Sequence, residues 1–325
     1  MKKKYILVTG CAGFIGMHYS IKLLNSGHNV IGIDNLNNYY SKKLKIARLR
    51  KLKKYVKFKF FQSDINNLNN LKKIIKNKKF NYVFHFAAQA GVRYSLIDPY
   101  SYINTNIVGL VNLLECFKNE KIKQFIFASS SSVYGRNKKQ PYDESQRTDQ
   151  PKSLYAATKK SGEIIAEYYS FYFDMKITAL RFFTVYGPWG RPDMSLFKFV
   201  DLIKQNKRID IFNNGQMSRS FTYIDDITES IFRLMNSKKN YKLNKLNILN
   251  IGGDKKINLN YFISIIEKEM KTKIKKNYLP MIKADVKETF SNNKKLKSLT
   301  KFEPNQSIKK GIKEFINWHD EYYSK

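Results

Sequence analysis

The fold of this chain is decided by residues 5–16, which read Y-I-L-V-T-G-C-A-G-F-I-G. Tyr5 to Thr9 is a short apolar run rich in β-branched residues, which predicts a buried strand. Three glycines follow at positions 10, 13 and 16, and an amphipathic helix follows them. The order strand, glycine turn and helix is typical of a dinucleotide-binding unit.

Each glycine has its own task in such a unit. Gly10 lets the chain reverse tightly, Gly13 lets the backbone approach a pyrophosphate, and Gly16 lets the helix pack on the strand. Because the helix begins at about Gly13, its free N–H groups point toward the phosphates. The spacing is G-x-x-G-x-x-G and not the commoner G-x-G-x-x-G, so the prediction depends on the strand and helix around it.

Asp34 stands at the end of the next predicted strand, residues 29–33. An acidic residue about twenty positions after the glycines normally hydrogen-bonds the adenosine ribose, and it repels the extra phosphate of NADP. The sequence therefore predicts NAD as the cofactor. Further strands are expected at residues 56–61, 82–86, 125–128 and 176–182. The strand at 82–86 is followed by Ala87, Ala88 and Gln89, near the switch point of a doubly wound sheet.

The alternation of strands and helices weakens in the second half of the chain. Helices are expected at residues 195–205, 225–235, 258–270 and 308–323, and short strands at 209–212 and 246–251. We expect an α/β fold, a Rossmann-type doubly wound parallel sheet with a smaller C-terminal lobe. Residues 1–183 would form the NAD-binding domain and residues 184–325 mainly the substrate-binding lobe. Whether some of its strands and helices return to the first domain stays open.

The net charge is +34, from 60 basic and 26 acidic residues among 325. The basic residues are mostly lysines scattered through every segment, with no basic block interleaved with aromatics. This pattern disfavours nucleic acid as a partner, although a positive field attracts small anionic substrates.

The two cysteines do not suggest a disulfide framework, and no apolar run reaches the length of a membrane span. The N-terminus leads directly into the first strand, which leaves no room for a signal peptide. We expect a cytoplasmic protein without a membrane partner.

Tyr155 and Lys159 share one face of a helix predicted from residue 153 to about 173, because they are four residues apart. The spacing alone proves little, since Tyr-x-x-x-Lys also occurs at residues 39/43, 55/59, 134/138, 172/176 and 241/245. The place of Tyr155 distinguishes it. It opens a helix that follows a strand ending in four serines, residues 129–132.

Four longer segments resemble the extended short-chain dehydrogenase/reductase family of sugar-nucleotide epimerases and dehydratases. They read A-A-Q-A-G-V-R-Y-S (87–95), S-L-Y-A-A-T-K-K (153–160), R-F-F-T-V-Y-G-P-W-G-R-P-D-M (181–194) and F-T-Y-I-D-D-I (221–227). Within the family they are most similar to UDP-glucuronate 4-epimerases, and the resemblance runs from Tyr5 to about Trp318. It departs at Ile282 and Lys283, and at 291–292, where Ser-Asn replaces a more usual acidic pair.

The resemblance implies 4-epimerisation of UDP-glucuronate through a 4-keto sugar. Tyr155, as a phenolate, would take the proton of the sugar 4-hydroxyl, with Ser130 sharing the proton path. Free tyrosine has a pKa near 10, and the Lys159 ammonium and the nicotinamide charge are expected to lower it. Lys159 would also hold the nicotinamide ribose. A homodimer through the helices at residues 99–118 and 153–173 is expected.

The same resemblance supplies the candidate site residues. The cofactor candidates are Gly10, Gly13, Phe14, Ile15, Gly16, Asp34, Asn35, Asp64, Ile65, Ala87, Ala88, Gln89, Asn106, Tyr155, Lys159 and Phe182. The substrate candidates are Arg93, Ser130, Thr184, Arg191, Arg219 and Asp285, with Arg219 on the diphosphate and Asp285 on the uridine ribose. Thr184 and Arg191 are expected to hold the C6 carboxylate in a geometry that prevents CO2 loss. No metal site is predicted.

Three alternatives stay open. Dehydratases and decarboxylases of this family carry one or two carboxylates directly after the position of Ser130, where this chain has Ser131 and Ser132, and a hydroxyl does not replace a carboxylate as acid or base. A 4-epimerase of a neutral UDP-hexose or UDP-N-acetylhexosamine is the second alternative. A non-catalytic NAD-binding protein is the third, disfavoured because all three catalytic positions are filled.

Overall fold

A seven-stranded parallel sheet forms the centre of the protein in this computed structural model, which describes residues 3–238, 246–281 and 286–324. The strand order is β10-β6-β5-β4-β1-β2-β3, so the order reverses between β1 and β4. The bounds are β1 Lys4–Thr9, β2 Val30–Asp34, β3 Phe58–Gln62, β4 Lys79–His85, β5 Gln124–Ser130, β6 Ile177–Phe182 and β10 Leu246–Ile251. The doubly wound sheet predicted from the sequence is confirmed.

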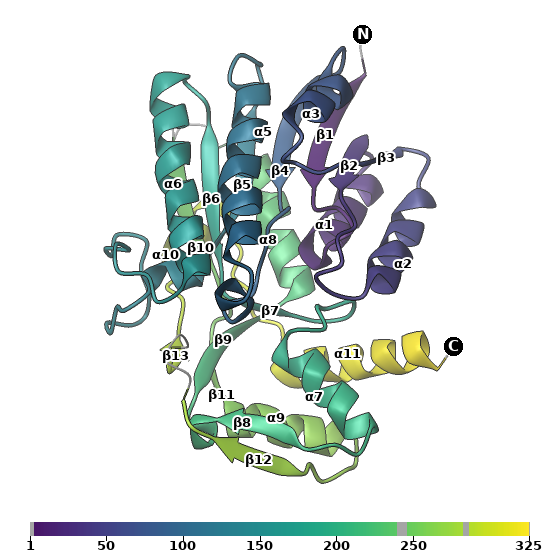
Figure 1. Ribbon diagram of the computed structural model, residues 1–325, viewed down its shortest axis with the longest axis vertical. Coiled ribbons are helices and arrows are strands. Elements are labelled where there is room, and N and C mark those ends of the chain that lie inside the picture. The colour runs from purple at the N-terminus through teal and green to yellow at the C-terminus, as the bar shows by residue number, and fades with distance from the viewer. Residues whose placement is uncertain (1–2, 239–245, 282–285, 325) are drawn as a thin grey trace.

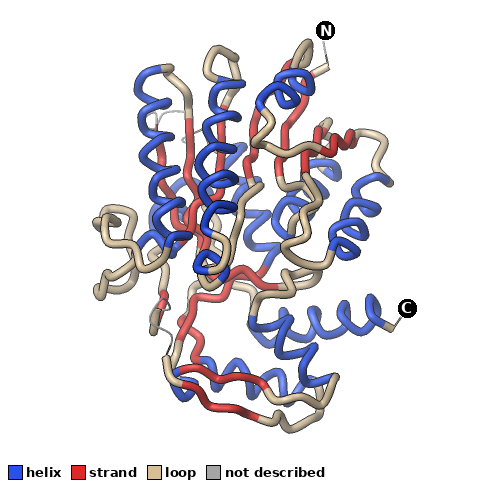
Figure 2. The backbone as a smooth tube through the Cα atoms, in the orientation of Figure 1, coloured by secondary structure: helices blue, strands red, loops and turns tan. Residues whose placement is uncertain are grey.

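Helices cover both faces of this sheet (Figures 1 and 2). One layer contains α3 Leu68–Ile75, α5 Gly109–Phe117 and α6 Leu154–Tyr172, and the other contains α1 Phe14–Asn25, α2 Lys42–Lys53, α8 Ile224–Asn236 and α10 Lys294–Thr300. Strand β1 shows why both faces are needed. Leu7 belongs to the core that contains Leu113 of α5, whereas Ile6 and Val8 belong to the core that contains Met17 of α1.

A smaller lobe lies beyond the carboxyl ends of the large sheet (Figure 1). Its four-stranded sheet consists of β7 Thr184–Tyr186, β9 Ser218–Tyr223, β11 Lys256–Asn258 and β13 Glu288–Thr289. A second sheet pairs β8 Ile209–Phe212 with β12 Lys276–Leu279, and the helices are α7 Ser195–Lys204, α9 Leu259–Glu269 and α11 Ile308–Tyr323. The chain passes between the large sheet and the smaller lobe more than once, because α8, β10 and α10 return to the large sheet.

The local structure differs from the sequence predictions in several places. The elements that the sequence did not predict are helices α3 and α10 and strands β7, β9, β11, β12 and β13. The helix expected at residues 99–118 consists of α4 Pro99–Ile103, a π-helical turn η2 at Asn104–Val108, and α5. Such turns widen a helix locally and are frequent at functional sites. In the described part of the chain, no helix is long and apolar enough to cross a membrane.

Candidate active site

A cleft of about 1140 Å³ lies between the carboxyl ends of the large sheet and the smaller lobe. The ends of β1, β2, β4 and β5 line one side, and residues from β7, α7, β8 and β9 line the other. The switch point between β1 and β4 therefore opens into the cleft, which is where doubly wound sheets bind their ligands.

The glycine turn is as tight as its sequence predicts. Gly10 has a φ of +69°, and a Cβ on Gly10 would lie 2.6 Å from the backbone nitrogen of Ala87. A Cβ on Gly16 would lie 2.0 Å from the carbonyl oxygen of Gly10. Among the described residues, no side chain caps α1 at Gly13, so the first N–H groups of this helix are available to an anion.

Asp34 lies buried at the end of β2. Its Oδ2 accepts a hydrogen bond from the backbone N–H of Ala12 at 3.0 Å, and its Oδ1 accepts one from Leu36 at 2.9 Å. Burial raises the pKa of this carboxyl, and the two backbone donors and the Lys45 ammonium oppose that rise. Each oxygen keeps lone pairs for a ribose hydroxyl. The turn without Cβ atoms, the uncapped helix and this carboxylate together fit NAD.

The catalytic candidates meet where β5 ends and α6 begins. Ser153 caps α6 by accepting from the backbone N–H of Ala156 at 3.1 Å, which sets the position of Tyr155 in the first turn. Lys159 lies one turn further along, and its Nζ donates to the carbonyl oxygen of Ala128 at 2.9 Å. Strand β5 ends at Ser130, on the same side of the cleft.

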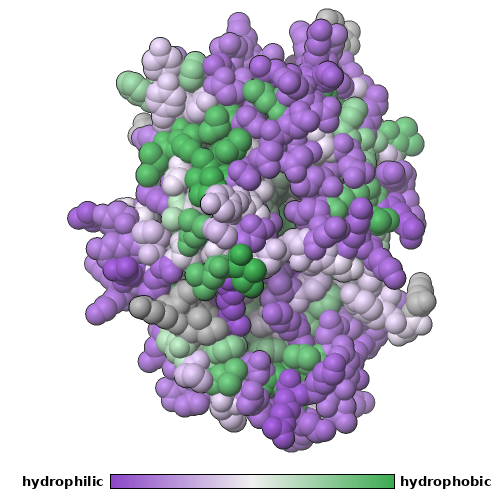
Figure 3. All heavy atoms as spheres, viewed as in Figure 1, coloured by the Kyte–Doolittle hydropathy of each residue, from purple (hydrophilic) through white to green (hydrophobic). Residues whose placement is uncertain are grey.

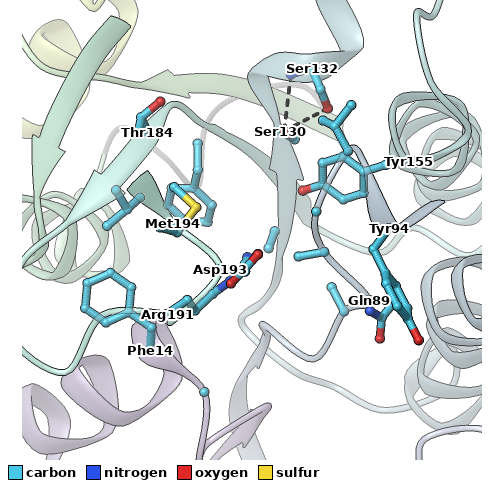
Figure 4. Close-up of a pocket in the computed structure, with 18 of the residues that line it drawn as sticks. Phe14, Gln89, Tyr94, Ser130, Ser132, Tyr155, Thr184, Arg191, Asp193 and Met194 are labelled. Carbon is cyan, nitrogen blue, oxygen red and sulfur yellow. Dashed lines mark hydrogen bonds and ion pairs between the residues drawn. The ribbon is translucent and has the colours of Figure 1, made fainter. Parts of the chain in front are cut away.

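Ser130 is oriented by its neighbour Ser132 (Figure 4). The backbone N–H and the hydroxyl of Ser132 both donate to Ser130 Oγ, at 3.2 and 2.9 Å. These bonds occupy both lone pairs of Ser130 Oγ, so its own proton is left to donate toward Tyr155. The structure therefore assigns Ser130 a donor role.

Burial and nearby charges act in opposite directions on Tyr155. Burial raises the pKa of Tyr155, while the Ser130 hydrogen bond and the positive charge of Arg191 oppose that rise. Burial also lowers the pKa of Lys159 to about 7, with Arg191 contributing. Lys159 Nζ lies 6.0 Å from the centroid of the Tyr155 ring, and the expectation that Lys159 and the nicotinamide charge lower the pKa of Tyr155 stays a prediction.

Arg191 and Thr184 lie on the opposite wall from Tyr155 (Figure 4). Arg191 does not present an empty fork, because its Nε donates to Asp193 Oδ1 at 2.9 Å and its Nη2 pairs with Asp193 Oδ2. Tyr39 donates to Asp193 Oδ2 at 3.2 Å. A substrate carboxylate therefore meets Arg191 only through the remaining edge of the guanidinium.

Two further arginines line the same cleft. The guanidinium of Arg93 lies 4.2 Å from the centroid of the Phe212 ring, so it joins the two sides of the cleft. Arg219 donates from Nη1 to the carbonyl oxygens of Ser218 and Lys287, both at 3.0 Å. The diphosphate contact expected of Arg219 stays a prediction.

Most candidate residues line the cleft, and two lie behind it. Asp64 accepts from Asn35 Nδ2 at 2.8 Å and so holds a lining residue in place. Asn106, in the π-helical turn, exchanges hydrogen bonds of 2.9 and 3.0 Å with the backbone of Gln89 and donates to Thr158. Asp285 lies outside the described residues. Among those that are described, no cluster of His, Cys, Asp and Glu is suited to hold a metal ion.

Comparison with known proteins places this site in a family. Residues 7–315 match the family model described as GDP-mannose 4,6 dehydratase. The chain belongs to this family of NAD-dependent epimerases and dehydratases. The sequence-based assignment to the family is thereby confirmed.

Three relatives illustrate the similarity, each over 98% of this chain. Protein CapI of Staphylococcus aureus is 44% identical over 98% of this chain and 99% of its own. A probable UDP-glucuronate 4-epimerase of Rhizobium meliloti is 41% identical over 98% of this chain and 97% of its own. The structure of UDP-glucuronic acid 4-epimerase from Bacillus cereus, in complex with UDP-glucuronic acid and NAD, superposes with a TM-score of 0.92. It shares 35% identity and covers 98% of this chain and 100% of that one.

Sequence reasoning missed three residues that shape the site of this family member. They are Ser132, Asp193 and Arg48, the last of which is buried and donates to Ala12, Tyr40, Trp189 and Gly190. Ser132 lies in the serine run 129–132 close to Ser130, and Asp193 lies in the segment 181–194 close to Arg191. Arg48 gave no local signal, since its partners at residues 189–190 are distant in sequence.

Proposed function

We propose that this protein interconverts UDP-glucuronate and UDP-galacturonate by NAD-dependent epimerisation at C4 of the sugar. The observation that carries the proposal is the shared cleft, in which the glycine turn, Tyr155 and Arg191 all take part. The UDP-glucuronate 4-epimerases among the relatives support the same reaction.

NAD, when bound, supplies the acceptor and the donor of the C4 hydride. The N–H groups at the start of α1 would hold its pyrophosphate, and Asp34 would hold the adenosine ribose. Lys159 would hold the nicotinamide ribose. Because NAD is regenerated in each cycle, the purified protein should carry it without any being added.

Tyr155 removes the proton of the 4-hydroxyl, which leaves a 4-keto sugar once the hydride has gone. The Ser130 hydroxyl donates its proton toward the oxygen of Tyr155 and the 4-oxygen of the sugar, because the lone pairs of Ser130 Oγ accept hydrogen bonds from Ser132. Arg191 favours the phenolate form of Tyr155 by its charge. The sugar then turns, and Tyr155 returns the proton after hydride reaches the other face of C4.

The 4-keto uronate is a β-keto acid, which loses CO2 when the breaking bond stands perpendicular to the carbonyl plane. An epimerase must therefore hold the C6 carboxylate away from that geometry. Thr184 and the outer edge of Arg191 lie on the wall opposite Tyr155 and supply hydrogen-bond donors for it (Figure 4).

A dehydratase or decarboxylase is the less favoured reaction for this cleft. Those enzymes need a carboxylate as acid or base close to the proton acceptor. The side chains that follow Ser130 are the hydroxyls of Ser131 and Ser132, and the second of these is committed to Ser130.

Nuclear magnetic resonance of UDP-glucuronate incubated with the protein tests the proposal. Signals of UDP-galacturonate should appear without added NAD, and acid release should yield NAD and not NADP. A parallel reaction with UDP-glucose tests the neutral-sugar alternative. Turnover of UDP-glucose but not of UDP-glucuronate would overturn the uronate assignment.

We propose in addition that the chain forms a homodimer through α4, α5 and α6. Figure 3 shows apolar surface gathered over the face that α5 and α6 present in Figure 1. The exposed apolar residues of this region are Leu96, Ile97, Tyr100, Ile103, Val108, Ile164, Tyr168, Phe171 and Tyr172. Light scattering after gel filtration should give twice the chain mass, and Phe171→Glu should reduce it to one chain.

A further inference from the structure

The ion pair between Arg191 and Asp193 uses the Nε–Nη2 edge of the guanidinium and leaves the Nη1–Nη2 edge available to a ligand. Nε and one Nη2 proton are committed to the two oxygens of Asp193. Arginine has five N–H donors, so three protons remain, on Nη1 and Nη2. Among the described residues, Nη1 has no hydrogen-bond partner. In the view of Figure 4 the pair and Thr184 lie on one side of the cleft and Tyr155 on the other.

We infer that Asp193 is a specificity-determining positioning residue, which fixes Arg191 so that its Nη1–Nη2 edge receives the C6 carboxylate of a UDP-hexuronate. A planar guanidinium gripped along one edge by one carboxylate offers its adjacent edge to a second carboxylate in a defined plane. This inference rests on the proposed function, because it assigns the carboxylate as ligand.

The pair is held from the cofactor side of the cleft. Tyr39, which follows β2, donates to Asp193, and a Cβ on Gly91 would lie 2.4 Å from the Tyr39 hydroxyl oxygen. Arg48 of α2 donates from Nη2 to the carbonyl oxygens of Trp189 and Gly190, at 2.6 and 2.9 Å. The segment that carries Arg191 is therefore fixed at both its backbone and its side chain.

The arrangement also explains how one arginine distinguishes a uronate from a neutral sugar. A neutral 6-hydroxyl accepts one hydrogen bond from this edge and carries no charge for the guanidinium to attract. A carboxylate gains two charge-assisted bonds to a guanidinium that is already oriented, and so loses less side-chain freedom on binding. Asp193 therefore increases the difference between the two nucleotides.

The chain contains a matched control with the same spacing. Arg147 Nε donates to Asp149 Oδ2 at 3.1 Å, so this pair is also Arg-x-Asp, but its side chains are 86% and 51% exposed. Those of Arg191 and Asp193 are 22% and 25% exposed. Asp149→Asn therefore removes the same kind of partner away from the cleft.

Binding is measured by calorimetry on the NAD-containing protein in a Tyr155→Phe background, which prevents turnover. Asp193→Asn should weaken UDP-glucuronate binding about tenfold, the size of one misplaced charge-assisted hydrogen bond, and change UDP-glucose binding less than twofold. Asp149→Asn should change neither. Once Arg191→Gln is present, adding Asp193→Asn should have no further effect on UDP-glucuronate.

Equal weakening of both nucleotides by Asp193→Asn, or full additivity with Arg191→Gln, would overturn the inference. If Asp193→Asn does not fold, Tyr39→Phe removes only the hydrogen bond to Asp193 and should shift UDP-glucuronate alone, about twofold. Turnover of UDP-glucuronate by the parent is scored separately by magnetic resonance. A failure of the proposed function would therefore appear in the turnover assay, and a failure of this inference would appear in the binding measurements.

Discussion

The two walls of the cleft are built differently. The wall that carries Ser130, Tyr155 and Lys159 consists of the end of a buried strand and the first turns of a long helix. The wall that carries Arg191 is a loop between β7 and α7, held by contacts to residues far away in sequence, such as Tyr39 and Arg48.

This difference determines what each wall contributes. Regular elements hold atoms that must not move relative to one another during proton transfer, because their backbone hydrogen bonds and packing fix them. In the loop wall, the bidentate ion pair with Asp193 holds the Arg191 guanidinium in one plane. The rest of the loop can then adjust to a sugar that turns in the cleft.

Tyr155→Phe should abolish turnover of UDP-glucuronate and leave its binding nearly unchanged. The ring stays and only the proton acceptor is removed, so a loss at or above the upper end of about 10²–10⁴-fold is expected. Turnover is followed by magnetic resonance and binding by calorimetry. Tyr172→Phe is the matched control, since Tyr172 lies on the same helix with a lysine four residues later but is exposed. Retained activity in Tyr155→Phe would mean that another group accepts the proton.

Glu163→Gln should destabilise the strand–helix wall. Glu163 of α6 accepts from Arg181 of β6 by two bonds of 2.8 Å and from the Ser129 hydroxyl at 2.7 Å, and it is buried. Removing one partner of a buried pair costs about 3–5 kcal/mol, because the other charge is left uncompensated. Thermal unfolding should show the loss of stability. In kinetic measurements, kcat should fall by a larger factor than the factor by which the KM for the nucleotide sugar changes.

Two controls accompany Glu163→Gln. Glu229→Gln breaks a more exposed pair with Lys22 and Arg233 and should cost less than about 1 kcal/mol. Replacing Glu163 and Arg181 together by apolar residues should recover much of the stability. An unfolding temperature for Glu163→Gln equal to that of Glu229→Gln would show that this wall does not depend on the buried pair.

Arg191→Ala should weaken UDP-glucuronate binding by about 10- to 150-fold, corresponding to roughly 1.5–3 kcal/mol for a charge-assisted hydrogen bond, and UDP-glucose far less. With the carboxylate no longer held, the variant should also release a decarboxylated 4-keto pentose nucleotide and NADH. Mass spectrometry of the reaction mixture detects that product. Arg147→Ala is the control, and a variant that handles both nucleotides as the parent does would remove Arg191 from carboxylate binding.

The sequence predicted the strand–helix wall better than the loop wall for a physical reason. The glycine turn, Asp34, and the pair Tyr155 and Lys159 act through neighbours within a few residues or at a fixed strand end, which periodicity and spacing reveal. The sequence pointed to Arg191 but not to its ion pair with Asp193 or to the hydrogen bond from Tyr39, because Tyr39 approaches Asp193 only in the folded chain. The contribution of Arg191 to the pKa of Tyr155 was missed for the same reason, and the cytoplasmic setting stays a prediction.

The smallest predicted effect joins the two walls through charge. Activity needs the Tyr155 phenolate, so kcat/KM should rise with pH through the pKa of Tyr155. Arg191 lowers that pKa and Asp193 raises it, because a positive charge favours the phenolate and a negative charge disfavours it. Arg191→Gln should therefore move the acidic limb of the profile to higher pH. Asp193→Asn should move it to lower pH, because it removes the negative charge that disfavours the phenolate.

The opposite signs make this last measurement specific. A general loosening of the loop would lower kcat/KM at every pH and leave the acidic limb in place. A charge effect moves the limb, and the direction of the move depends on whether a positive or a negative charge has been removed. Profiles are recorded at two salt concentrations on protein with its NAD content verified, and the limb shifts should shrink modestly at the higher one. Arg147→Gln and Asp149→Asn change the net charge by the same amounts away from the cleft and should leave the limb unmoved. Shifts of the same sign in Arg191→Gln and Asp193→Asn would show that the loop wall acts on Tyr155 through its position, and that the charges of the two walls are independent.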